Sequence, residues 1–219
     1  MSPQSQMIDR RETSVRKMLT ALFEATDGAV ENALLCIKHH DTKLAQAIID
    51  GDTEINQLCH STEDECVAVI ARMQPMARDL RELISDMQIA AELERIGDYA
   101  ATIASKVQLM DIPPAKEIVE TVWQLGEHCR NMLASVWQAY EAHDSEQARE
   151  TARLDNEIDA AEQAITQQVF AWQNEHPDDF MISAYTLWIT HSLERIGDRA
   201  TNIAERVVYI ATSKTEDLN

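Results

Sequence analysis

The feature that most constrains this chain is an internal repeat. Residues 93–107 read LERIGDYAATIASKV and residues 193–207 read LERIGDRATNIAERV, and ten of these fifteen positions are identical without a gap. A weaker echo precedes each copy, GDTEIN at 51–56 and LDNEID at 154–159. Self-similarity of this kind is typical of a fold built from repeated copies of one structural unit. We therefore expect two tandem halves of the same architecture.

The repeated unit is expected to be helical. Only 5 Gly and 5 Pro occur in 219 residues, of which 45% are hydrophobic. Apolar residues recur at steps of three and four, which is the spacing of one face of an α-helix. The periodic stretches run over 15–37, 44–69, 76–107, 118–140, 158–172 and 182–210. The pattern predicts an all-α protein made of two tandem, pseudo-symmetric three-helix bundles joined by short loops.

Two adjacent prolines mark the boundary between the halves. Residues 111–114 read DIPP, and proline both lacks an amide hydrogen and restricts the residue before it, so no helix continues through this segment. We place the first bundle at 1–111 and the second at 112–219.

Shorter signals locate the helix ends. Polar breaks are expected at 39–41 and at 174–178. Pro75 suits the first turn of the third helix, where a missing amide hydrogen costs nothing. Asp144 or Ser145 suits the N-cap of the middle helix of the second half.

The charge of the chain limits its partners. It carries 38 Asp and Glu against 19 Lys and Arg, a formal net charge of −19. Binding to nucleic acid is driven largely by Lys and Arg, so we expect no nucleic-acid partner. The first residues, MSPQSQMIDRRE, are polar, and no run of 18 apolar residues occurs, so the sequence predicts a soluble, cytoplasmic protein.

The four cysteines are Cys36, Cys59, Cys66 and Cys129, without a CxxC pair or a Cys/His ligand spacing. We expect them to be reduced and to lie on the core faces of helices. A disulfide or a thiolate ligand is the alternative.

Each copy of LERIGD carries two carboxylates four residues apart. Glu94 with Asp98, and Glu194 with Asp198, lie one turn apart on one face of a helix. The helical period directs Glu94 and Asp98 roughly opposite to the core positions of their helix. Such a pair repels by about 0.2–0.5 kcal/mol unless something bridges it. A repulsive pair kept in two copies indicates a compensating cation or arginine.

The middle helices carry similar pairs. Asp52 with Asn56, and Asp155 with Asp159, share the same spacing and flank the core face. Each half thus offers four oxygen-bearing side chains, which suit a hard cation such as Mg, Ca or Mn, or iron bridged by carboxylates.

The second copy offers two additional candidate ligands. His191, three residues before Glu194, and Glu205 could join the second site only.

Both copies carry a glycine inside the helix, Gly97 and Gly197. Each glycine lowers the stability of its helix by about 1 kcal/mol relative to alanine. We expect another group to approach the backbone closely at these glycines.

Two alternatives stay open at this point. The carboxylates could form a solvated face paired with Arg95 and Arg195, and the chain would then be a metal-free helical scaffold whose exposed tryptophans anchor a partner. A di-iron enzyme would need Glu-x-x-His on two helices, and no glutamate is followed by histidine three residues later.

The motifs together resemble the PhoU family. The resemblance covers nearly the whole chain: two three-helix halves, LERIGD in each last helix, and DxxxN or DxxxD in each middle helix. The first half also carries QP followed by DLR, at 74–75 and 79–81, and NIAE stands at 202–205. The first half departs from NIAE, with Thr102 and Ser105.

The resemblance implies a non-enzymatic negative regulator of the phosphate regulon. Since some relatives serve other transporters, regulation of another transporter is the alternative. The resemblance implies a homodimer that connects the phosphate-specific ABC transporter to its sensor histidine kinase and reaches the membrane only through these partners. It also implies divalent or iron-type ions (Fe, Zn, Mn, Mg or Ca) held in surface clusters. By motif, the ligands fall on Asp52, Asn56, Glu94, Asp98, Asp155, Asp159, Glu194 and Asp198.

Overall fold

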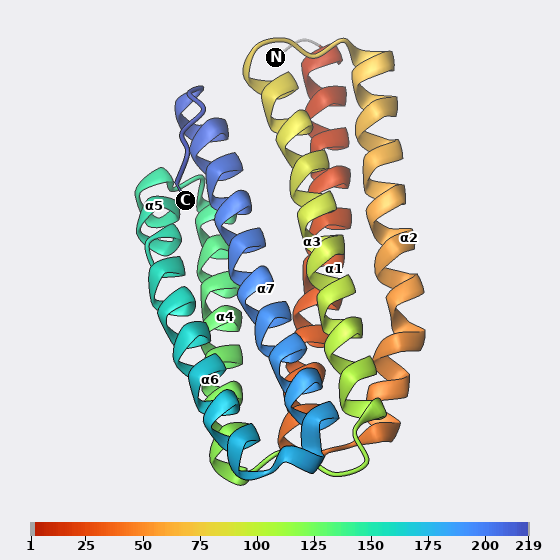
Figure 1. The fold of residues 1–219 in the computed structure, drawn as a ribbon. Helices are drawn as coiled ribbons and strands as arrows, with labels where there is room; N and C mark the ends of the chain where they lie inside the picture. Colours follow the sequence, from red (N-terminus) through yellow and green to blue (C-terminus); the bar gives the residue numbers. More distant parts are fainter. Residues whose placement is uncertain (1–2, 219) are drawn as a thin grey trace.

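The chain folds into two helical bundles that lie side by side (Figure 1). The computed structural model describes residues 3–218, with side chains from residue 14 onward, and no strand occurs among them. The helices are α1 (Pro3–His39), α2 (Thr42–Met73), α3 (Arg78–Leu109), α4 (Lys116–Ala142), α5 (Ser145–Ala152), α6 (Asp155–Glu175) and α7 (Phe180–Thr212), with a 3₁₀ turn, η1 (Pro177–Asp179), before α7. The all-α prediction is confirmed. For the described residues, no helix is both long enough and apolar enough to cross a membrane.

The two repeat-bearing helices form the centre of the molecule. Helix α3 packs along α7, α1 and α2 complete the first bundle, and α4, α5 and α6 complete the second (Figure 1). One hydrophobic core runs through both bundles, from Leu19 and Leu93 in the first half to Leu133 and Ile203 in the second. Each repeat helix therefore has neighbours on more than one side, which shapes the environment of its carboxylates.

The two bundles are also linked directly through their first helices, α1 and α4. The rings of Phe23 on α1 and Trp137 on α4 stack with centroids 4.3 Å apart. Arg130 on α4 donates two hydrogen bonds, of 2.9 and 3.0 Å, to the carboxylate of Asp27 on α1. Such bidentate pairs fix relative orientation as well as adding energy.

All four cysteines are buried and free, as expected. Burial raises the pKa of the Cys36, Cys59 and Cys66 thiols to about 12. These groups therefore stay protonated and behave as small apolar core side chains.

Two helix starts follow from capping chemistry. The carboxylate of Asp41 accepts the amide hydrogens of Lys43 and Leu44, each at 3.0 Å. Asp144 does the same for Glu146 and Gln147, also at 3.0 Å, so Asp144 and not Ser145 is the cap. Both carboxylates satisfy amides that have no partner within the helix.

Replacing the cap Asp144 by alanine is expected to lower the free energy of unfolding by about 1 kcal/mol, because two amides of the first turn lose their acceptor. Urea unfolding followed by circular dichroism measures the loss. Asp111→Ala, which removes an exposed carboxylate of the interbundle linker, is the matched control. Equal stabilities of the two variants would contradict the capping role.

Two expectations about helix ends were wrong. Pro75 precedes α3 instead of lying in its first turn, because Ala77 adopts φ 51°, in the left-handed region, and α3 starts only at Arg78. The middle helix of the second half is divided into α5 and α6. Between them the amides of Leu154 and Glu157 bond to carbonyls three residues back, at 3.1 and 3.0 Å. This tightening ends one helix and makes Asp155 the first residue of the next.

Candidate metal centres

The first candidate site lies where α2 runs along α3. We call Asp52, Asn56, Glu94 and Asp98 the first acidic seam. The amide nitrogen of Asn56 donates a 3.0 Å hydrogen bond to Oδ2 of Asp52. Oδ1 of Asp52 and Oδ1 of Asn56 are buried without a hydrogen-bond partner among the described residues. Unsatisfied buried oxygens are costly, so each is a ready acceptor for a cation.

Electrostatics confirm that the two helices bring these groups together. Partial burial, then the charges of Asp98 and Asp52, raise the pKa of Glu94. Partial burial and the charge of Asp52 likewise raise the pKa of Asp98. A cation placed among the three carboxylates would relieve this repulsion.

The second candidate site repeats the arrangement between α6 and α7. We call Asp155, Asp159, Glu194 and Asp198 the second acidic seam. Burial and the charges of Asp198 and Asp159 raise the pKa of Asp155 to about 6. Burial, followed by the charges of Asp198, Asp159 and Glu162, raises the pKa of Glu194 to about 7, against a lowering effect of Arg195. Four carboxylates therefore crowd one strip of surface.

The second seam has three further features that bear on cation binding. Oδ1 of Asp155 is buried and accepts no hydrogen bond within the described part of the chain, and Oε2 of Glu194 is buried beside the ring of His191, whose Nδ1 lies 3.2 Å away. Asp155 also begins α6, whereas its counterpart Asp52 lies inside α2. The second seam carries one carboxylate more than the first, because Asp159 stands where the first has Asn56, and it is the stronger candidate.

The outward direction expected for Glu94 and Asp98 holds for Asp98, which is exposed, whereas Glu94 is half-buried. It does not extend to the second copy, where the side chains of Glu194 and Asp198 are only 19% and 17% exposed. The wheel of one helix assumes one buried face. The central helix α7 is instead covered by α6 on the flank that bears the carboxylates, so they lie in a seam between helices.

The close approach expected at the glycines is confirmed. A Cβ atom on Gly97 would lie 3.0 Å from Cγ2 of Ile55 on α2. A Cβ on Gly197 would lie 3.0 Å from Cδ1 of Ile158 and 3.1 Å from Oδ1 of Asp155, both on α6. Glycine thus lets each middle helix come close enough to bring its acidic pair beside that of the repeat helix.

The arginines of the repeat use different partners. Arg95 pairs with Glu92 at 2.7 Å and is 52% exposed. Arg195 pairs with Asp198 and donates a 3.5 Å hydrogen bond to the hydroxyl of Tyr99. In the second seam an arginine therefore compensates one of the four carboxylates directly, that of Asp198.

The two extra ligand candidates of the second half have different positions. Nδ1 of His191 is 3.2 Å from Oε2 of Glu194, and the ring is 65% exposed, so His191 lies at the mouth of the second seam. Glu205 is not brought to it: its oxygens accept the amide of Leu218 at 3.1 Å and a hydrogen bond from Arg206 at 3.3 Å. Glu205 fixes the C-terminal segment against α7.

Two neighbours of the acidic seams were not predicted from the sequence. The charge of His60 on α2 lowers the pKa of Glu94, and Glu162 on α6 acts on Glu194. His60 continues the row of Asp52 and Asn56 at a spacing of four, and Glu162 follows Asp159 by three. Extending the helical row by one turn would have found both.

The donors fit a hard divalent cation in chemistry and in charge. Among residues 14–218, however, no three His, Cys, Asp or Glu side chains converge in their present rotamers on one metal position. An ion would have to draw the carboxylates together by side-chain rotation. The unsatisfied oxygens of Asp52 and Asp155 supply a reason for them to move.

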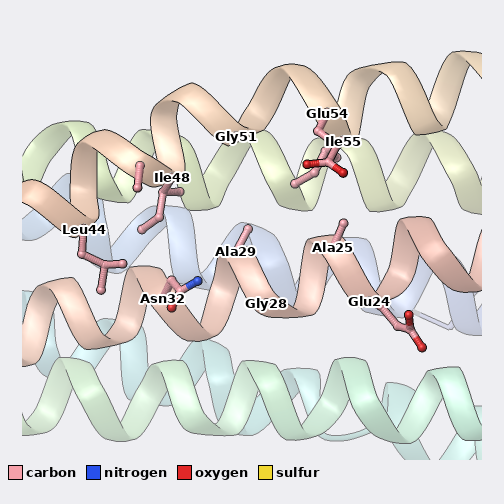
Figure 2. A pocket seen from close by; sticks show the side chains of 11 residues that line it. Glu24, Ala25, Gly28, Ala29, Asn32, Leu44, Ile48, Gly51, Glu54 and Ile55 are labelled. Carbon is pink, nitrogen blue, oxygen red and sulfur yellow. The ribbon is translucent and has the colours of Figure 1, made fainter.

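A separate hollow of about 370 Å³ lies between α1 and α2 (Figure 2). It exists because Gly28 and Gly51 stand in open space, with no atom within 4 Å of a Cβ built on either. Its lining is apolar apart from Glu24, Asn32 and Glu54. These glycines thus differ from Gly97 and Gly197, where a side chain has no room.

The fold and the seams define a class: an all-helical protein of two matched bundles, each with an acidic seam between its middle and last helices. The chain belongs to the PhoU family, since the PhoU domain model matches residues 19–107 and 122–207.

Known relatives match this chain over most of their length. The chain is 33% identical over 207 residues to the "Phosphate-specific transport system accessory protein PhoU homolog" of Pseudomonas putida, covering 94% of this chain and 81% of that protein. The homologue of Clostridium acetobutylicum is 28% identical over 202 residues, covering 92% of each chain. The crystal structure of PhoU from Streptococcus pneumoniae superposes with a TM-score of 0.88 at 30% identity, covering 96% of this chain and 99% of that one.

Proposed function

We propose that this protein is a non-enzymatic regulator of phosphate transport. In this role it associates with a phosphate-specific ABC transporter, restrains phosphate uptake, and connects the transporter to a sensor histidine kinase from the cytoplasmic side, as a homodimer. The observation that carries the proposal is the match of both bundles to the PhoU domain. Relatives bearing this domain are named as accessory proteins of phosphate-specific transport, and a superposable structure is named a phosphate transport system regulatory protein.

We further propose that the two acidic seams bind divalent metal ions. Each seam joins a middle helix to a repeat helix, so a bound cation would connect α2 with α3 and α6 with α7. It would also neutralise carboxylates whose mutual repulsion already raises their pKa. Metal occupancy would then set how firmly each bundle is held together.

A genetic experiment tests the regulatory role. Deleting the gene in its host is expected to raise alkaline phosphatase activity and phosphate uptake in high-phosphate medium, because the restraining component is absent. A plasmid copy of the gene should restore the low level. Normal repression in the deletion strain would reject phosphate signalling as the function.

Metal analysis tests the seams. Protein purified without chelator is expected to contain divalent metal, and a variant with Asp155→Asn, Asp159→Asn, Glu194→Gln and Asp198→Asn should lose the part bound at the second seam. Elemental analysis by mass spectrometry gives the content. Metal added at about 100 times its Kd should raise the free energy of unfolding of the unaltered chain by about 2.7 kcal/mol.

A control variant separates ligand loss from charge loss. Asp64→Asn, Glu120→Gln, Glu141→Gln and Glu150→Gln remove the same charge from exposed positions. This variant should keep its metal. Equal metal content in the seam variant and the control would refute binding at the second seam.

A further inference from the structure

An apolar groove lies at the end of the molecule where the two bundles are joined. It has a volume of about 340 Å³ and is formed by the segment from Leu109 to Ile112 together with residues of η1 and of the start of α7, namely Asp178, Asp179, Met181, Ile182 and Tyr185. Segments distant in sequence thus share one concave surface. The volume falls within the range of sites that bury a few apolar groups of a ligand.

Large apolar side chains gather at this groove while exposed to solvent. Leu109, Ile112 and Met181 line it and are 54%, 55% and 52% exposed. Phe180 and Trp188, on the same helix as Met181, are 64% and 59% exposed. These five are half of the exposed large hydrophobic residues in the described part of the chain. Such a concentration marks an interaction surface, whereas single exposed apolar residues do not.

The rim of the groove is acidic. Asp111, Asp178 and Asp179 line it together with the apolar residues, and its lining contains no Lys, Arg or His. Nζ of Lys106 on α3 lies over the ring of Trp188, 4.2 Å from its centroid. An occupant therefore meets apolar side chains in the centre and three carboxylates around them.

The charge pattern selects among occupants. Anionic lipid surfaces would be repelled by the three rim carboxylates and by the net charge of −19. A second copy of this chain docked groove to groove would oppose the same carboxylates to themselves. A protein segment that carries apolar side chains flanked by Lys or Arg satisfies both parts of the surface.

We propose that this groove docks an apolar, Lys/Arg-flanked segment of a partner protein. Met181, Tyr185 and Trp188 follow one another at steps of four and three along α7, so the apolar strip spans about two helical turns and passes beyond the groove by about one. An amphipathic helix laid along this strip would place its apolar side chains on it and its basic side chains toward the three aspartates. The inference stands whether or not the partner belongs to a phosphate transporter.

Peptide binding to the full chain tests the groove. The probe is a fluorescent amphipathic peptide of Leu and Lys, measured by anisotropy, with a Leu and Glu peptide of the same pattern as reference. Ile112→Ser with Met181→Ser should weaken binding of the Lys peptide about tenfold, equivalent to about 1.4 kcal/mol. Asp178→Asn with Asp179→Asn should weaken it by a similar factor at low salt and by less at high salt.

The control variant is Val67→Ser with Phe170→Ser, which removes equally exposed apolar residues from α2 and α6 and should bind like the unaltered chain. Equal affinity of groove and control variants, or equal binding of the Glu peptide, would overturn the proposal. Loss of dimerisation in the Ile112 and Met181 variant, seen by light scattering, would assign the groove to self-association instead. Vesicle binding that depends on the same two residues would assign it to lipid.

Discussion

The Gly197→Leu variant is expected to lose about 1–2 kcal/mol of unfolding free energy. Even the first added atom would lie 3.0 Å from Ile158 and 3.1 Å from Asp155, and overfilling a close contact costs about 1–3 kcal/mol. Leucine gives back somewhat less than 1 kcal/mol through its better helix propensity. The difference between this cost and this gain is the net loss of unfolding free energy. The cost arises because α6 must move away from α7.

The same movement would separate the two halves of the second acidic seam. The metal affinity of Gly197→Leu is therefore expected to fall as well, although no proposed ligand is altered. Urea unfolding measures stability, and metal titration of the folded variant measures affinity. The pair of readings distinguishes a positional effect on the seam from simple unfolding.

Gly51→Ala provides the matched control. No atom lies within 4 Å of the position that its Cβ would occupy, and alanine in a helix interior is about 0.5–1 kcal/mol more favourable than glycine. This variant should be stabilised. If Gly197→Leu matched it, the close helix contact would not be needed for stability.

Much of this fold could be predicted because the relevant signals are local. Helical periodicity, the proline pair at 113–114 and the cap at Asp144 act within a few residues, and each corresponds to a feature of the structure. The duplicated glycine could also be interpreted, since a residue that costs stability at both copies indicates a close contact. In both halves the contacting side chain is an isoleucine three residues after the first aspartate of the seam, Ile55 or Ile158.

What the sequence could not supply depends on several helices at once. The outward direction expected for Glu94 and Asp98 does not carry over to Glu194 and Asp198, because the position of α6 places those carboxylates in a seam. The end of α5 also had no local signal, because Arg153 and Leu154 are ordinary helix-forming residues whose backbone angles stay near helical values. The apolar groove joins Ile112 and Met181, which become neighbours only when the two bundles are assembled.

The second seam should also make stability depend on pH. The pKa of Asp155 rises from 3.8 to about 6 and that of Glu194 from 4.5 to about 7. A raised pKa means that the folded state binds the proton more tightly than the unfolded state does. The stabilising contribution of these groups is therefore complete below about pH 4 and is lost as the pH rises through about 6 to 7.

A variant with Asp155→Asn and Glu194→Gln keeps the shape of both side chains and removes their charges. In the presence of chelator it is expected to exceed the unaltered chain in unfolding free energy by roughly 2 kcal/mol near pH 8, a value reduced for the partial exposure of the seam. Near pH 4 the two should be equally stable. Urea unfolding at pH values between these limits traces the difference, and Glu120→Gln with Glu141→Gln controls for total charge.

Metal should reverse the sign of that difference. A divalent ion bound at the second seam stabilises only the chain that retains its carboxylates, so above about pH 7 the unaltered protein should become the more stable one once metal is added. If the difference in unfolding free energy between the two proteins changed neither with pH nor with metal, Asp155 and Glu194 would be satisfied by solvent. The same carboxylates would thus weaken the metal-free bundle and strengthen the metal-bound one, which is the property that a metal-dependent regulator of bundle stiffness requires.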